Sequence, residues 1–364
     1  MRKAVRFEVV EMSGSRYQMG RQYGEQCRER IHDLSGRFDR MLLDPEYLEE
    51  GRQVAMEALP HVQREAPELI DEVEGIADGA GLGFEEVFRL SCSQEMNSWQ
   101  GCMRNQASAT VSDGCTSMAA KTDGASLVAW NMDWRIKWQP FMVLVHGRPN
   151  DGPDFLSFAM AGSVGRPGLA EHIAIAANFL SYRATPEYPA GGAQWAGAGV
   201  PYSFLARMLL AQGSTEDALA MLRRTRRMAC LNYTLGDTGG DICCVETMPE
   251  HMAVLRPDNS FITHANSYHA EEFNGIPMDQ REERDPRAYR AWEVLSRREQ
   301  PLERADIYRA QRSHFPRQST GVCVHTGGEK PSITLLSFVG DLRQRQMWAA
   351  YGSPCEHRFL RYDL

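Results

Sequence analysis

The chain has 364 residues and a formal net charge of −8 at pH 7, with 43% hydrophobic and 24% charged residues. This is the composition of an ordinary globular protein with ample material for a large core. The acidic balance, with no basic run interleaved with aromatics, argues against nucleic-acid binding. No run of about 18 apolar residues and no signal-peptide apolar region occurs, so we expect a cytoplasmic protein without a membrane span.

The first 110 residues are predicted to be mostly helical. "SGSRYQMGRQYGEQCRERIHDL" is typical of a turn followed by an amphipathic helix that Ser13 or Ser15 caps. A further helical region extends to about residue 81, interrupted by Pro60 and Pro67, and residues 83–98 predict another helix.

The pattern changes at Cys115. "CTSMAAKTDGASLVAWNMDW" predicts a β-hairpin that turns at Thr122-Asp123-Gly124. Strands alternate with helices from there to the end, and a Gly-, Ala- and Pro-rich stretch over 183–201 is long enough to be a functional loop. Strands in two runs with helices between and around them predict a layered sandwich. The predicted strands lie over 141–149, 154–162 and 172–183, and hairpins are predicted over 231–257 and 333–354. Two helices are predicted within 200–227 and one over 285–300.

Cys115, preceded by Gly114 and followed by Thr116, is the first candidate nucleophile. A lone cysteine is more often a small core residue than a catalytic one. A catalytic cysteine needs a base, and none of the ten histidines lies in a recognisable cysteine-protease context. The alternative base is the α-amine of an N-terminal cysteine, whose ordinary pKa of about 7.7–8.0 suits neutral pH. This requires cleavage of the Gly114–Cys115 bond, and glycine places no Cβ beside the scissile carbonyl.

The segment "DGCTSMAAKTDGASLVAWNMDW" resembles the start of the mature chain in the acyl-CoA:6-aminopenicillanate (isopenicillin N) acyltransferase-like family of N-terminal nucleophile (Ntn) hydrolases. The resemblance continues through "MSGSRYQMGRQYGEQ", "IAIAANFLSYR", "LNYTLGDTGGDICCVETMP", "FITHANSYH" and "MWAAYGSPCE". It implies an α+β fold, a four-layer αββα sandwich, with a helical N-terminal pro-segment. Residues 1–114 would be the pro-segment and residues 115–364 the catalytic chain released by self-cleavage.

The same resemblance implies the roles of individual residues. Cys115 would be the nucleophile, and Asp133 in "NMDW" would hold its freed α-amine. Asn266 in "THANSYH" would donate its side-chain N–H to the oxyanion, and the backbone N–H of Asn178 would be the second donor. Further candidates for the active site or for substrate contact are Arg287 or Arg290, between which the sequence does not decide, Trp134 and Tyr182.

Each role has a structural alternative. Asp133 is also explained as a carboxylate at a strand end, and Asn266 as the cap of a turn. Trp134, Trp138 and Trp195 line an acyl pocket or pack in the core. His264 and His269 lie near Asn266, but no third ligand accompanies them, so we expect no metal and no cofactor. If the chain stays uncleaved, these two histidines are the first candidate bases.

Two features depart from the family pattern. Related bile-salt and penicillin V hydrolases carry an arginine just before the Asn-x-Asp-Trp block, where this chain has Trp130, and they lack a long pro-segment. Both differences favour the acyltransferase-like branch and argue against bile salts as substrates.

The function implied is that of a self-processing cysteine amidohydrolase or N-acyltransferase, with a setting in specialised metabolite biosynthesis. It would act on a linear amide or thioester through an S-acyl intermediate on Cys115. Its partners would be a small-molecule acyl donor, water or an amine as acceptor, and its own cleaved pro-segment, with no nucleic acid and no membrane. The alternative from another class is a non-catalytic or uncleaved member that acts as a binding or scaffold protein.

Overall fold

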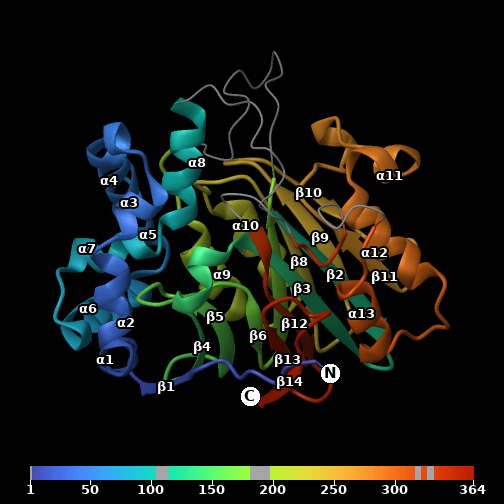
Figure 1. Cartoon of the computed structure of the whole chain (residues 1–364), viewed down its shortest axis with the longest axis horizontal. Coiled ribbons are helices and arrows are strands. Elements are labelled where there is room, and N and C mark those ends of the chain that lie inside the picture. The colour runs from blue at the N-terminus through green and yellow to red at the C-terminus, as the bar shows by residue number, and fades with distance from the viewer. Residues whose placement is uncertain (1, 104–113, 181–196, 316–320, 326–331) are drawn as a thin grey trace.

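Two stacked β-sheets with helices on both outer faces make up the computed structural model, which describes residues 2–103, 114–180, 197–315, 321–325 and 332–364. The blue and cyan helices lie on one side of the sheets and the orange helices on the other (Figure 1). Strand β7 (Ile173–Phe179) of one sheet packs against β2 (Gly114–Thr122) and β3 (Ala125–Arg135) of the other. The four-layer αββα sandwich predicted from the sequence is confirmed.

The first sheet has eight strands in the order β1-β4-β5-β6-β7-β8-β9-β10. Neighbours pair antiparallel except β1 and β4, which are parallel. The predicted strands over 141–149, 154–162 and 172–183 are confirmed in type, whereas β1 and the three-residue β6 were not predicted. The strands not yet given are β1 (Val9–Gly14), β4 (Met142–Pro149), β5 (Phe155–Met160), β6 (Gly168–Ala170), β8 (Leu231–Asp237), β9 (Ile242–Thr247) and β10 (Met252–Leu255).

The second sheet carries the predicted hairpin. Its order is β11-β2-β3-β12-β13-β14, and all its pairs are antiparallel. Because both faces of β2 and β3 are covered, nearly every residue in them is buried. Met118 and Leu127 face the helices, whereas Ala119 and Val128 face the other sheet, as a period of two requires. The remaining strands are β11 (Phe261–His264), β12 (Ser332–Asp341), β13 (Gln346–Tyr351) and β14 (Leu360–Asp363).

Most helices follow the predicted regions, with local sequence signals at their ends, whereas α11 and α13 were not predicted. Ser15, not Ser13, caps α1 in a capping box with Gln18, and Ser214 caps α10. The α-helices are α1 (Arg16–Gln26), α2 (Arg28–Ser35), α3 (Phe38–Leu42), α4 (Leu48–Met56), α5 (Leu59–Glu65), α6 (Pro67–Ala80), α7 (Phe84–Leu90), α8 (Ser93–Met103), α9 (Tyr202–Leu210), α10 (Thr215–Arg224), α11 (Arg281–Arg284), α12 (Pro286–Ser296) and α13 (Arg304–Gln311). Short 3₁₀ turns are Pro45–Tyr47, Ile136–Phe141, Glu271–Phe273 and Met278–Gln280.

The segment before Cys115 is integrated into the sandwich. Its strand β1 extends the eight-stranded sheet beside β4, from Val9 opposite Leu144 to Gly14 opposite Pro149. Arg207 on α9 forms a buried two-pronged ion pair with Glu72 on α6, at 2.6 and 2.9 Å. A buried bidentate pair is costly to break, because either charge alone would be left in a low-dielectric interior. These contacts hold residues 2–103 to the rest of the fold.

Glycines allow α1 and α6 to pack at backbone contact. A Cβ built on Gly20 would lie 2.0 Å from the carbonyl oxygen of Glu72. A Cβ built on Gly24 would lie 2.4 Å from the carbonyl oxygen of Ile76. Gly75 and Gly79 on α6 meet the carbonyl oxygens of α1 in the same way. The two helices therefore interlock through small residues spaced four apart, an arrangement that permits close backbone approach.

Replacing Gly24 with alanine is expected to destabilise the protein, because the new methyl group must push two backbones apart. We expect a loss of about 2 kcal/mol and a fall of roughly 4 °C in the unfolding midpoint. Thermal unfolding followed by circular dichroism measures this effect. Gly83→Ala is the matched control, since its added Cβ meets nothing within 4 Å. Equal midpoints for both variants would contradict the backbone contact.

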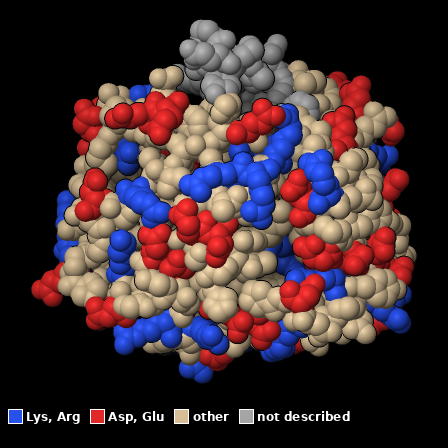
Figure 2. All heavy atoms as spheres, turned by 180° about the vertical axis from the view of Figure 1, so that it is seen from behind, with Lys and Arg blue, Asp and Glu red and all other residues tan. Residues whose placement is uncertain are grey.

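The surface carries charges of both signs close together. Figure 2 shows acidic and basic side chains interspersed over one face. Exposed pairs such as Arg256–Asp241 at 2.7 Å and Arg21–Glu25 at 3.0 Å are examples of such neighbours. Pairs of this kind contribute little to stability in water. Within the described residues, no helix is both long and apolar enough to cross a bilayer.

Candidate active site around Cys115

The hairpin of β2 and β3 brings Gly114 and Cys115 to the strand end that carries Asp133. In the antiparallel register, Gly114 lies opposite Asp133 and Cys115 opposite Met132. Asp133 is buried, and its Oδ1 accepts a hydrogen bond of 2.6 Å from the hydroxyl of Thr334 on β12. The turn at Gly124, which has a positive φ of 78°, sets this register.

Asn266 reaches the same point from the loop after β11. Its Oδ1 accepts a hydrogen bond of 2.9 Å from the backbone N–H of Cys115, and its Nδ2 donates to the carbonyl of Phe179 at 2.7 Å. Asn266 thus contacts the nitrogen that would become the α-amine of Cys115. In the intact chain its N–H group is engaged by Phe179, so its role as an oxyanion donor stays a prediction.

Arg287 on α12 joins these residues. Its Nη2 donates to Oδ1 of Asn266 at 2.5 Å, and its Nη1 donates to Oδ2 of Asp133 at 3.2 Å. The guanidinium also covers Gly114, because a Cβ there would lie 2.1 Å from Nη1. A side chain at position 114 would therefore displace the end of the Arg287 side chain, a contact that the sequence does not reveal.

The choice between the two candidate arginines is decided by the packing of α12. Arg287 is buried at the site, whereas Arg290 is partly exposed and pairs with Glu293 on its own helix at 2.5 Å. The structure brings Arg287 to Cys115 and leaves Arg290 away from this cluster.

Cys115 is buried, and its thiol is held in the neutral form. Burial is the main cause that raises its pKa to about 12, and the nearby Asp133 carboxylate raises it further. The Arg287 and Arg166 charges act in the opposite direction but do not overcome these effects. Because the thiolate is the reactive form, the thiol needs a neighbouring base before it can attack.

Asn178 lies on β7 next to Phe179, where the sequence places a second oxyanion donor. Its side-chain Nδ2 donates 2.6 Å to the hydroxyl of Ser117 on β2, so the side chain links the two sheets. This fits the expectation that the backbone of Asn178, rather than its side chain, would act. The backbone role itself stays a prediction.

A buried aromatic and arginine cluster adjoins Cys115. Trp134 stacks on Trp138 with ring centroids 4.8 Å apart, and Arg166 lies 5.7 Å from the rings of both Trp134 and Tyr202. Arg166 donates to the Ser93 hydroxyl on α8 at 3.3 Å, which ties the cluster to the segment before Cys115. Sequence reasoning missed Arg166, since the turn "GSVGRPG" that carries it has no recognisable motif.

Three of the sequence predictions fall wholly or mostly on residues that the structure does not describe. Tyr182, Trp195 and most of the loop over 183–201 lie outside the described residues.

Glu95 on α8 is buried beside this cluster and accepts a hydrogen bond of 2.6 Å from the backbone N–H of Tyr202. Burial raises its pKa from 4.5 to about 7. Between pH 4.5 and about 7 the unfolded carboxyl is ionised while the folded one keeps its proton. This group therefore stabilises the fold fully below pH 4.5, and the stabilisation is lost as pH rises to about 7.

Replacing Glu95 with glutamine, which mimics the protonated acid, is expected to prevent the fall in stability between pH 4.5 and about 7. The variant should exceed the wild type in stability at pH 8 by an amount on the order of 3 kcal/mol and match it near pH 4. Unfolding midpoints between pH 4 and 8 measure the difference, with the exposed Glu85→Gln as control. A parallel pH profile for Glu95→Gln and wild type would contradict the burial of an ionisable Glu95.

His264 and His269 form a separate buried network. Nε2 of His264 lies 2.6 Å from Oε1 of Glu246, and Nε2 of His269 lies 2.8 Å from Oδ2 of Asp285. Glu246 also accepts hydrogen bonds from the backbone N–H groups of His269 and Ala270. Burial lowers the pKa of His269 to about 4. Each histidine already has a carboxylate partner, which accounts for both residues as a structural network.

Comparison with known proteins agrees with the class that the fold and the hairpin indicate, a hydrolase or acyltransferase that acts on amide bonds. The chain belongs to the family described as acyl-coenzyme A:6-aminopenicillanic acid acyl-transferase, whose model matches residues 120–356. It is therefore an enzyme of the hydrolase and acyltransferase class.

A curated protein and several solved structures are also similar. Beta-alanyl-dopamine/carcinine hydrolase from Drosophila melanogaster is 25% identical over 308 residues, which are 75% of this chain and 73% of that protein. Penicillin V acylase from Agrobacterium tumefaciens has 14% identity and a TM-score of 0.47 over 69% of this chain and 86% of its own. A variant of conjugated bile acid hydrolase from Clostridium perfringens has 14% identity and a TM-score of 0.45, and the match covers 69% of this chain and 97% of that one.

Proposed function

We propose that this protein is a self-processing cysteine amidohydrolase or N-acyltransferase that works through an S-acyl intermediate on Cys115. The observation that carries the proposal is the convergence of Asp133 and Asn266, joined by Arg287, on the backbone of Gly114 and Cys115. Three separate segments of chain supply these side chains. A buried convergence of charged and amide groups on one peptide bond is more than a solitary core thiol requires.

Self-processing would begin with attack of the Cys115 thiol on the carbonyl carbon of Gly114. The Gly114–Cys115 C–N bond breaks as the C–S bond forms, the thiol proton passes to the freed amine, and water then hydrolyses the thioester. The products are a fragment of 114 residues that ends in a carboxylate and one of 250 residues that begins with Cys115. Strand β1 and the Arg207–Glu72 pair would keep the fragments together.

The freed α-amine of Cys115 would then be the general base for its own thiol. It would occupy the place of the present backbone nitrogen, 2.9 Å from Oδ1 of Asn266. The Arg287 guanidinium nearby disfavours a positive charge on the amine, whereas Asp133 favours one. The opposing charges, together with an ordinary pKa of about 7.7–8.0, would leave the amine able to take a proton near neutral pH.

The reaction would run in two halves. The Cys115 thiol attacks the carbonyl of an amide or thioester, and the oxyanion that forms is stabilised by N–H donors, for which Asn266 and the backbone of Asn178 are the candidates. The leaving group departs with the proton from the amine and leaves an acyl group on sulfur. Water resolves this thioester in a hydrolase, and an amine resolves it in an acyltransferase.

The substrates to test first follow from the Drosophila relative, whose name specifies β-alanyl-dopamine and carcinine. Purified protein is incubated with β-alanyl-dopamine, carcinine and simple N-acyl amides, and the release of free amine is measured. Mass spectrometry of the quenched enzyme should show the acyl group on the peptide that begins at Cys115. Turnover without any acylated Cys115 would overturn the covalent mechanism.

The alternative of a scaffold without catalysis makes the opposite prediction for thiol labelling. An enzyme with an activated N-terminal cysteine should react with iodoacetamide first at Cys115. A scaffold should show no preferred cysteine. Peptide mapping after brief labelling separates the two.

A further inference from the structure

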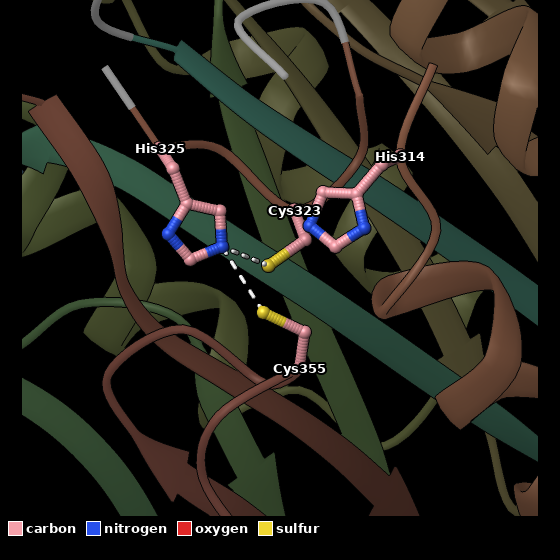
Figure 3. Close-up of side chains that lie close together, drawn as sticks. All are labelled: His314, Cys323, His325 and Cys355. Carbon is pink, nitrogen blue, oxygen red and sulfur yellow. Dashed lines mark hydrogen bonds between the residues drawn. The ribbon is translucent and has the colours of Figure 1, made fainter. Parts of the chain in front are cut away.

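Four side chains that bind transition metals converge at the end of the sandwich where α13, β12 and the chain after β13 meet. They are His314, Cys323, His325 and Cys355, and their ligand atoms all lie within 4.8 Å of one another. Figure 3 shows the two imidazole rings and the two thiols turned toward a common point. Sequence reasoning did not group them, because the spacing matches no known metal motif.

The distances suit a tetrahedral ion. Nε2 of His325 lies 3.0 Å from Sγ of Cys355 and 3.4 Å from Sγ of Cys323. A zinc ion bound at about 2.3 Å to sulfur and about 2.0 Å to nitrogen places its ligand atoms roughly 3.3–3.8 Å apart. All four ligand atoms lie within 4.8 Å of one another, so shifts of about 1 Å or less bring them to the spacing of a zinc site.

The backbone around the cluster is fixed by hydrogen bonds. The N–H of Cys323 donates to the carbonyl of Ser313 at 3.0 Å, which brings the chain of His314 beside that of Cys323. The side chain of Arg312 donates 3.0 Å to the carbonyl of Pro354, next to Cys355. Metal sites that are rigid before binding lose little entropy when the ion binds, and these bonds supply that rigidity.

The chemistry of the cluster also favours a metal over buried thiols alone. A thiolate is the form that binds metals. Two thiols and two imidazoles form a nitrogen and sulfur ligand set that selects zinc among the common divalent ions.

We infer that His314, Cys323, His325 and Cys355 form a structural zinc site. Four protein ligands leave no open position for water or substrate, which is the pattern of a structural rather than a catalytic site. The ion would join the segment after α13 to the segment after β13.

The site is also connected to the candidate active site. Val324, between two of the ligands, donates its backbone N–H to the hydroxyl of Thr334 at 2.9 Å, and that hydroxyl donates to Asp133 at 2.6 Å. The N–H of Thr334 in turn donates to the carbonyl of Val324 at 3.1 Å. Zinc would therefore hold Val324 and, through it, Thr334, whose hydroxyl orients the Asp133 carboxylate. The ion would position these residues and would take no part in the reaction.

The test is the zinc content of purified, dialysed protein by inductively coupled plasma mass spectrometry. We expect about one zinc per chain in the wild type and a loss of at least about tenfold in Cys355→Ser and His325→Asn. Cys243→Ser and His172→Asn, at residues outside the cluster, are the matched controls and should keep the metal. Metal content is read without an activity assay, so the test is independent of the proposed function.

A second measurement on the wild type covers the case in which the variants do not fold. Zinc should protect Cys323 and Cys355 from iodoacetamide, and removal of zinc by a chelator should expose both to labelling. Cobalt(II) added to the chelator-treated protein should give the thiolate-to-metal absorption of a tetrahedral site. Metal-free wild type that takes up neither zinc nor cobalt, or a disulfide between Cys323 and Cys355 in the mapped peptides, would overturn the inference.

Discussion

Replacing Cys115 with alanine is expected to abolish both the cleavage at Gly114–Cys115 and the turnover of amides. The variant lacks the only atom that attacks in either step, so turnover should fall by at least about 10⁴-fold. Denaturing gel electrophoresis follows processing, and amine release follows turnover. The chain should persist as one species of 41.0 kDa.

The control for Cys115→Ala is Cys230→Ala, which removes another buried thiol away from the hairpin. It should process and turn over like the wild type. Cys115→Ser tests the nucleophile by chemistry instead of removal. A hydroxyl is a weaker nucleophile than a thiol, so this variant should process more slowly than the wild type but still process. Intact processing or turnover in Cys115→Ala would exclude this residue as the nucleophile.

Replacing Asp133 with asparagine is expected to reduce both processing and turnover by about 10²-fold or more, with little change in shape. The carboxylate accepts hydrogen bonds from Thr334 and from Arg287. An amide offers one acceptor and one donor, so its N–H₂ must face one of these two donors. The Arg287 charge also loses its buried partner, which costs about 3–5 kcal/mol when only one member of such a pair is removed.

Asp123→Asn, in the exposed turn of the same hairpin, is the control for Asp133→Asn. The readout includes the pH dependence of turnover. Asp133 is proposed to hold the protonated α-amine of Cys115, so loss of the carboxylate should lower the pKa of that amine. The rise of turnover with pH should then move to lower pH. A variant that loses stability but keeps the rate and pH profile of the wild type would assign Asp133 to structure alone.

The sequence predicted the hairpin and the layered fold because those features depend on local signals. Largely apolar runs on either side of the turn at Thr122-Asp123-Gly124 specify the strands, and the turn fixes the register that places Asp133 beside Gly114. Strand β1 was missed because its "VVEMSG" has few residues and a polar, partly exposed face. The three residues of β6 are too few for any periodicity to appear.

The contacts that complete the site depend on packing between distant segments. Arg287 and Arg290 are three residues apart on one helix, and only the approach of α12 to β11 and β2 decides which one is buried. Arg166, Glu95 and Thr334 carry no motif and reach the site through turns and sheet order. The cysteines and histidines of the proposed zinc site span 42 residues, and their convergence depends on the pairing of β12 with β13.

The measurement that tests the central claim most directly is the intact mass of the purified protein under denaturing conditions, with N-terminal sequencing of each species. We predict two fragments of 114 and 250 residues, the larger beginning Cys-Thr-Ser-Met. That result would establish the free α-amine on which the proposed mechanism depends. A single uncut chain that remains uncut over days, in a preparation that nevertheless hydrolyses amides, would contradict it.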